Sequence, residues 1–213
     1  MSEDEPMVFI VDDDESTRKS LQRLINAVGL RVEAFATATE FLQRQPYDGP
    51  ACLVLDVLLP GLNGLALQET LVAAERHIPI VFITAHGDIP MSVRAMKAGA
   101  VDFLTKPFSH QDFIEAVERA ITMDGRARQA RAIIQDMRQC VQKLTPREHE
   151  VFALVVTGML NKEVAAALGT SEQMIKVHRA HLMQKMQVQS FAQLVQLAVT
   201  LDLIPSKHTS SLT

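Results

Sequence analysis

The stretch Val8-Phe9-Ile10-Val11-Asp12-Asp13-Asp14 is an apolar run that ends in three consecutive carboxylates. A second run, Cys52-Leu53-Val54-Leu55-Asp56, also ends in an acidic residue. Continuously apolar runs of this length indicate strands buried on both faces, as in a parallel sheet. In doubly wound sheets, ligands bind in a crevice outside the carboxyl ends of the strands. We therefore expect these acids to share one crevice.

Outward from these runs, short apolar segments alternate with amphipathic ones as far as residue 122. Further strands are expected at Val32–Phe35, Ile80–Ile83 and Asp102–Thr105. Helical patterns lie between them, near Glu15–Val28, Ala38–Gln45, Gly64–Glu75, Ile89–Ala98 and Ser109–Thr122. Strands that alternate with helices predict a doubly wound α/β domain over residues 1–122.

Two more polar groups follow strands of this sheet, Thr84 after the fourth and Lys106 after the fifth. Three carboxylates in one crevice repel each other unless a cation joins them, and Mg²⁺ prefers oxygen ligands. Asp56 is then the candidate nucleophile for phosphoryl transfer, with the metal and Lys106 neutralising charge. Any one of these residues alone is an ordinary cap, turn or surface residue. Their joint occurrence at four of five strand ends favours a functional site.

The segment 123–143 is a predicted linker helix, polar and rich in arginine and glutamine. Gly125 disfavours helix by ~1 kcal/mol relative to alanine, so we expect a break between the last helix of the first domain and the linker. Apolar residues recur at four-three spacing, at Ala130, Ile134, Met137, Val141 and Leu144. This spacing fits a short coiled-coil seam or a helix packed on a neighbouring domain, and both remain open.

The sequence of residues 144–206 predicts an all-helical domain. Thr145-Pro146-Arg147-Glu148 is a capping box with proline at the first helical position. Asn161 is expected to cap a second helix, which Gly169 ends, and Ser171 to cap a third helix that runs to about Met186. A fourth helix is expected to begin near Ser190. Residues 207–213 are predicted to be a polar tail.

Bulk properties fit two globular domains in 213 residues. Residues 1–122 hold 18 acidic and 10 basic residues, whereas residues 123–213 hold 7 and 11. The basic second half hints at nucleic-acid binding. No apolar run is long enough for a membrane span, and the acidic N-terminus does not resemble a signal peptide. The two cysteines match no zinc pattern, so we expect a reduced, cytoplasmic chain.

Residues 7–122 closely resemble a CheY-like receiver domain. The matching pieces are Val11–Asp14, Asp56–Gly61, Thr84–Gly87, Lys97–Ala100 and Lys106–Phe108. The resemblance implies a five-stranded parallel sheet of flavodoxin-like order 2-1-3-4-5 and a cis Lys106–Pro107 bond.

By the same resemblance, Asp56 is the phosphoacceptor, Lys106 the motif's lysine, and Thr84 and Phe103 the switch pair. Asp13 would bind Mg²⁺ directly and Asp12 more through water. The backbone carbonyl of Leu58 would complete the protein ligands, with Asp56.

Residues 145–204 resemble the LuxR/NarL-type helix-turn-helix domain, through Leu144–Glu148, Asn161–Ala165 and Ile175–Arg179. On the predicted helix after Ser171, Ile175, Leu182 and Met186 form the core stripe. The outward side carries Gln173, Val177, Ala180 and Gln184, flanked by Lys176 and His181. The family's base-reading positions fall on Lys176, Val177 and Ala180, while Lys162 and Lys185 are better placed for phosphates.

Two departures matter within this domain. Met174 stands where the family usually has threonine, so a hydroxyl contact to the DNA backbone is expected to be missing. Ala180 offers no hydrogen-bonding group and would read less sequence. His178 and Arg179 lie toward the core side and are expected to pack rather than read bases.

Nearly the whole chain therefore resembles a FixJ-type two-component response regulator, a group that includes the styrene-responsive regulator StyR. The resemblance implies a transcription factor activated by a sensor histidine kinase. Phosphorylation is expected to drive homodimerisation through Ile89–Gly99 and Asp102–Thr105, and the dimer would bind promoter DNA and act with RNA polymerase.

The sequence disfavours three alternatives to this interpretation. A hydrolytic enzyme using the same Mg²⁺ aspartate lacks a second substrate motif. A phosphorylation-independent module with a decayed receiver site conflicts with the intact acids. An autoinducer sensor conflicts with the receiver-like first domain.

Overall fold

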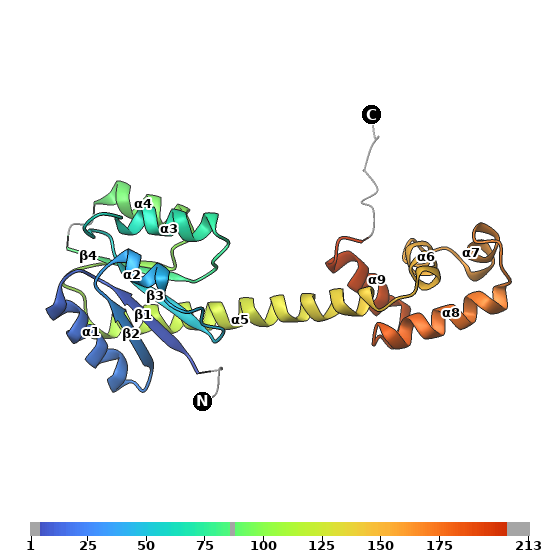
Figure 1. Cartoon of the computed structure of the whole chain (residues 1–213), viewed down its shortest axis with the longest axis horizontal. Coiled ribbons are helices and arrows are strands. Elements are labelled where there is room, and N and C mark those ends of the chain that lie inside the picture. The colour runs from blue at the N-terminus through green and yellow to red at the C-terminus, as the bar shows by residue number, and fades with distance from the viewer. Residues whose placement is uncertain (1–4, 86–87, 204–213) are drawn as a thin grey trace. The chain divides into compact units, whose positions relative to one another are not determined.

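The computed structural model describes residues 5–85 and 88–203, and Figure 1 traces their course. The predicted tail at 207–213 lies outside these residues, as do His86 and Gly87. The strands are β1 (Met7–Val11), β2 (Arg31–Phe35), β3 (Ala51–Asp56), β4 (Ile80–Thr84) and β5 (Asp102–Thr105). The helices are α1 (Glu15–Ala27), α2 (Ala38–Gln43), α3 (Gly64–Ala73), α4 (Ile89–Lys97), α5 (His110–Gln142), α6 (Pro146–Val155), α7 (Asn161–Ala167), α8 (Glu172–Lys185) and α9 (Phe191–Thr200).

The five strands form one parallel sheet of order β2-β1-β3-β4-β5, which confirms the predicted fold. Alternate residues of each central strand face opposite sides, so the sheet buries two separate clusters. Phe9, Leu53 and Phe82 pack with Phe41, Leu67 and Ala95 from α2, α3 and α4. Val8, Val54 and Ile83 pack with Ile25 of α1 and Phe113 of α5. The helices therefore cover both faces (Figure 1).

Helix α5 is continuous through Gly125, so the predicted break there is wrong. The residues around Gly125 explain this. Asp124 is 1 % exposed, and its carboxylate accepts hydrogen bonds from the backbone nitrogen of Ala51 (2.9 Å) and from Nε of Arg128 (2.6 Å). These charge-assisted bonds hold both sides of Gly125 and outweigh its ~1 kcal/mol helix penalty.

The chain divides into two compact units, Met1–Gln129 and Ala130–Thr213. The second unit has its own core, built from α6 to α9 around Val151, Ile175, Leu182 and Leu194. Ile134, Met137, Val141 and Leu144 pack into this same core. The apolar seam is thus used in packing on the helical domain, the second of the two predicted alternatives. The four-part division at residues 122/123, 143/144 and 206/207 stays a prediction.

The helix caps of the second unit follow the sequence with one exception. Thr145 and Glu148 form the predicted capping box, Ser171 and Ser190 cap α8 and α9, and Gly169 has a left-handed φ of 59° after α7. Asn161 was expected to cap α7 but is its first helical residue, preceded by Leu160. The Asn161 side chain instead accepts a hydrogen bond from Arg179 of α8 (2.9 Å). The asparagine therefore fastens α7 to α8.

Candidate functional site

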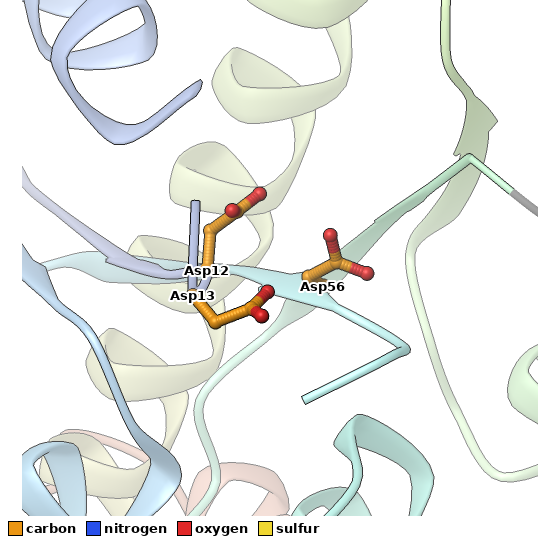
Figure 2. Close-up of side chains that lie close together, drawn as sticks. All are labelled: Asp12, Asp13 and Asp56. Carbon is orange, nitrogen blue, oxygen red and sulfur yellow. The ribbon is translucent and has the colours of Figure 1, made fainter. Parts of the chain in front are cut away.

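An acidic cluster lies at the carboxyl ends of β1 and β3. Ligand atoms of Asp12, Asp13 and Asp56 all lie within 4.8 Å of one another. Figure 2 shows the three carboxylates gathered at these strand ends. Asp12 and Asp56 are buried, whereas Asp13 is exposed. Oxygen donors in this number and spacing fit a hard divalent cation such as Mg²⁺.

Lys106 brings a positive charge to two of the three acids. Its Nζ lies 2.8 Å from Oδ2 of Asp12 and 2.7 Å from Oδ2 of Asp56. The other oxygen of Asp56 accepts from the backbone nitrogen of Leu58 (2.9 Å), and that of Asp12 from Asp14 (2.9 Å). Three carboxylates thus share one nearby ammonium group. Their unbalanced negative charge is what a bound cation would offset.

Burial and neighbouring charge act in opposite directions on the pKa values of Asp12 and Lys106. Burial raises the pKa of the Asp12 carboxyl above its usual range, although Lys106 and the Asp14 amide oppose this rise. Burial also lowers the pKa of Lys106, but hydrogen bonds to Asp12 and Asp56 outweigh it, so the net shift is upward. Lys106 is therefore held as a cation beside the two buried acids.

The ends of β4 and β5 meet beside this cluster. Thr84 is fully buried, and its carbonyl accepts from the backbone nitrogen of Lys106 (2.7 Å). Phe103 is half-buried on β5, with its ring centroid 6.2 Å from that of Phe82. The Lys106–Pro107 bond is cis, as the resemblance implied. The structure thus brings Thr84 and Lys106 together at the carboxyl ends of β4 and β5, whereas Phe103 lies nearer the start of β5.

Two residues near the acids were not singled out from the sequence. Nη1 of Arg18 donates to the carbonyl of Asp12 (2.7 Å), which steadies the strand end from α1. Gly64 begins α3, and a Cβ there would lie 2.4 Å from the carbonyl oxygen of Asp56. Only glycine allows this approach. The sequence feature that could have pointed to this turn is the pair Asn63–Gly64 between β3 and α3, because Asn63 caps α3.

The second unit presents a polar face along α8. Ile175, Leu182 and Met186 are buried, as the periodicity predicted. His178 and Arg179 are half-buried on the core side. All the outward residues predicted for this helix are exposed: Gln173, Lys176, Val177, Ala180, His181 and Gln184. Lys162, on α7, is also exposed. An exposed face on a helix that is packed against α6 and α7 is the arrangement of a recognition helix.

Lys185 differs from these exposed residues. Its Nζ lies 2.6 Å from Oε2 of Glu148 and 3.4 Å from the carbonyl of Lys143. Glu148 is 4 % exposed and also accepts from the backbone nitrogen of Thr145 (2.7 Å). The hydrogen bond from Lys185, followed by that from Thr145, lowers the pKa of Glu148 to about 2. Lys185 thus anchors the end of α8 to the start of α6.

Comparisons with known proteins agree over both units. Residues 8–118 match the response regulator receiver domain family, and residues 142–198 match the family of bacterial regulatory proteins of the luxR type. Nodulation protein W of Bradyrhizobium diazoefficiens is 49 % identical over 203 residues, which cover 95 % of this chain and 89 % of that protein. Transcriptional regulatory protein FixJ of the same organism is 39 % identical, over 90 % of this chain and 94 % of its own length.

Solved structures give the same answer. The response regulator StyR has 47 % sequence identity and a TM-score of 0.83, covering 92 % of this chain and 98 % of its own. Full-length FixJ from B. japonicum has 36 % identity and a TM-score of 0.55, over 95 % of this chain and 100 % of its own. The chain belongs to the two-component response regulators, with a receiver domain followed by a LuxR-type DNA-binding domain.

Proposed function

We propose that this transcriptional regulator is switched by phosphorylation of Asp56. The family is one of transcription regulators rather than classical enzymes, and its two domains imply a sensor kinase and DNA as partners. The observation that carries the proposal is the bridge from Lys106 to Asp12 and Asp56, which leaves one acid, Asp13, exposed beside it. This arrangement offers a carboxylate nucleophile next to fixed positive charge.

In the proposed transfer, a carboxylate oxygen of Asp56 attacks the phosphorus while the bond from phosphorus to the donor atom breaks, a histidine nitrogen in the kinase or an oxygen in acetyl phosphate. Bound Mg²⁺, held by Asp12, Asp13, Asp56 and the carbonyl of Leu58, would neutralise charge on the phosphoryl group. The ammonium group of Lys106 would contact one of the phosphoryl oxygens. Self-phosphorylation and self-dephosphorylation of Asp56 are the chemistry that the chain itself would perform.

The proposed switch runs from Asp56 to the surface of α4 and β5. The phosphoryl group would draw in Thr84 by a hydrogen bond, and Phe103 would turn inward into the space that Thr84 leaves. The surface that this repacks carries Ile89, Val93 and Met96, which are 80 %, 43 % and 45 % exposed. An apolar surface of this kind suits a homodimer interface formed on phosphorylation.

The proposed DNA contacts lie in the second unit. Gln173, Lys176, Val177, Ala180 and His181 would face the major groove, and Lys162 would meet a phosphate. Lys185 would meet a phosphate from the exposed part of its side chain while its ammonium stays paired with Glu148. A dimer would place two such helices on half-sites about one DNA turn apart, where the regulator would act with RNA polymerase. Across the described residues, no helix has the length and hydropathy that crossing a membrane requires. We place the regulator in the cytoplasm, where its kinase signal and promoter would meet.

Incubation with acetyl phosphate and Mg²⁺ tests the acceptor. Intact-mass spectrometry is expected to show one phosphoryl group on the wild-type chain and none on Asp56→Asn. Asp48→Asn is the matched control, because Asp48 is an exposed acid outside the cluster. Undiminished labelling of Asp56→Asn would reject Asp56 as the acceptor.

Sedimentation with and without a phosphoryl analogue tests the interface. We expect a dimer only with the analogue, lost on changing Val93 and Met96 to aspartate. A dimer of equal strength in both states, lost instead on changing Ile134 and Met137, would contradict the proposed surface. Ile134 and Met137 already pack in the core of the helical domain, which argues against a dimer along that seam.

A further inference from the structure

A second concave site lies at the opposite edge of the receiver sheet from the acids. It adjoins Ala51, the first residue of β3, whereas Asp56 is the last. The cavity has a volume of about 180 Å³. Apolar and cationic side chains line it, among them Phe41, Tyr47, Leu71, Arg44, Arg76 and Arg128.

The charge of this cavity is positive and only partly balanced. Arg128 is paired with Asp124 (2.6 Å). Within residues 5–85 and 88–203, Arg44 and Arg76 form no ion pair at salt-bridge distance. Nε of Arg44 is buried and has no hydrogen-bond partner in the part of the chain that the structure describes. Burial lowers the pKa of Arg44, Glu33 opposes this, and the positive charges of Arg76 and Arg128 add to it. An anion placed here would relieve the repulsion among the three guanidinium groups.

The remaining walls of the cavity are apolar and aromatic. The guanidinium of Arg44 lies over the rings of Phe9 and Phe41, with its Cζ 3.9 Å and 4.7 Å from their centroids. A dry cavity of ~150 Å³ is known to hold benzene, so this one has room for a single ring with a small charged group. From the cavity, its unpaired arginines and its apolar walls, we propose that it binds a small organic anion with a one-ring apolar body, of the arylcarboxylate class.

The available donors place the anionic end of such a ligand. Arg128 is already occupied by Asp124 and by the carbonyls of Asp48 (2.8 Å) and Tyr47 (3.5 Å). Among the described residues, Arg76 makes one long hydrogen bond, to the carbonyl of Leu42 (3.4 Å). Arg76 therefore reaches the carboxylate most readily, with Arg44 beside it. Because Arg76 is exposed, its truncation is not expected to disturb folding.

Titration of the full-length chain with benzoate, followed by amide chemical shifts, tests the proposal. We expect saturable shifts at the residues that line the cavity. Arg76→Ala should weaken benzoate binding about tenfold, because a charge-assisted hydrogen bond is lost. Arg44→Met keeps an apolar stem over Phe9 and should weaken it similarly. Arg23→Ala, which removes an exposed arginine from α1, is the control and should bind as the wild type does.

Two further ligands separate charge from apolar body. Benzyl alcohol keeps the ring without the charge, and inorganic phosphate keeps the charge without the ring, so both should bind far more weakly. Absence of saturable benzoate binding, unchanged affinity in both arginine variants, or equal binding of either comparison ligand would overturn the proposal. Asp56→Asn should bind benzoate normally, so this test and that of the phosphoacceptor fail independently.

Discussion

Replacing Lys185 with methionine should destabilise the helical domain, because the change breaks the ion pair between Lys185 and Glu148. The methionine keeps most of the apolar stem, so the change removes the charge. Glu148 is 4 % exposed and keeps only its bonds from Thr145, at 2.7 Å from the nitrogen and 3.0 Å from Oγ1. Breaking a fully buried pair costs about 3–5 kcal/mol, and an exposed one about 0–1. Because the Lys185 side chain is 36 % exposed, we expect a loss of about 2 kcal/mol.

Hydrogen exchange of the α6 and α8 amides in the full-length chain measures this loss. A change of 2 kcal/mol corresponds to about a 30-fold increase in the opening equilibrium. Lys162→Met is the matched control, because Lys162 is exposed on α7 and should change exchange less than about twofold. Adding Glu148→Gln to Lys185→Met should recover part of the loss, since the buried charge goes. Exchange in Lys185→Met within twofold of wild type would refute the reasoning.

The remaining predictions concern the two sites and the glutamate. Asp13→Asn should weaken Mg²⁺ binding at least tenfold in calorimetry, because a ligand charge is lost while Asp13, being exposed, carries no packing. Gly64→Ala should destabilise the receiver by about 2 kcal/mol or more in urea unfolding, because its Cβ would press on the Asp56 carbonyl. Lys176→Ala should cost ~1–3 kcal/mol on one operator sequence and relax specificity, whereas Lys162→Ala should weaken all sequences alike and lower the salt slope; equal scaling of every sequence by both would contradict base reading by Lys176. The pKa of Glu148 lies at about 2 in the fold and at 4.5 ordinarily, so its stabilising effect is full above pH 4.5 and fades toward pH 2. Acid unfolding followed by circular dichroism should lose that dependence in Glu148→Gln.

The strand-end residues could be predicted because a parallel sheet leaves few alternatives. Continuous apolar runs mark its buried strands, and every carboxyl end then lies on one edge, so Asp56 and Lys106 had to approach each other. The exposed face of α8 followed equally from periodicity, since Ile175 and Leu182 define the opposite side.

Long-range partners of polar residues could not be predicted in this way. Asp124 reaches the backbone of Ala51, which is 73 positions away in the sequence, and it thereby keeps α5 intact through Gly125. Asn161 bonds Arg179 rather than its own helix, and Lys185 joins Glu148. Periodicity shows which way a residue faces, but the group that meets it depends on how the elements pack.

Lys106 joins two parts of the receiver that could otherwise respond separately. Its ammonium holds Asp12 and Asp56, while its own backbone nitrogen holds the carbonyl of Thr84. Suppose that a ligand bound at the acids changes the affinity of this strand end for a contact by some factor. Because coupling between binding sites is reciprocal, that contact must then change the affinity of the acids for their ligand by the same factor. If phosphorylated receivers associate as proposed, their association would by the same rule favour the cation-bound and phosphorylated state of each. The abundance of the regulator in the cell would itself set how readily it stays switched on.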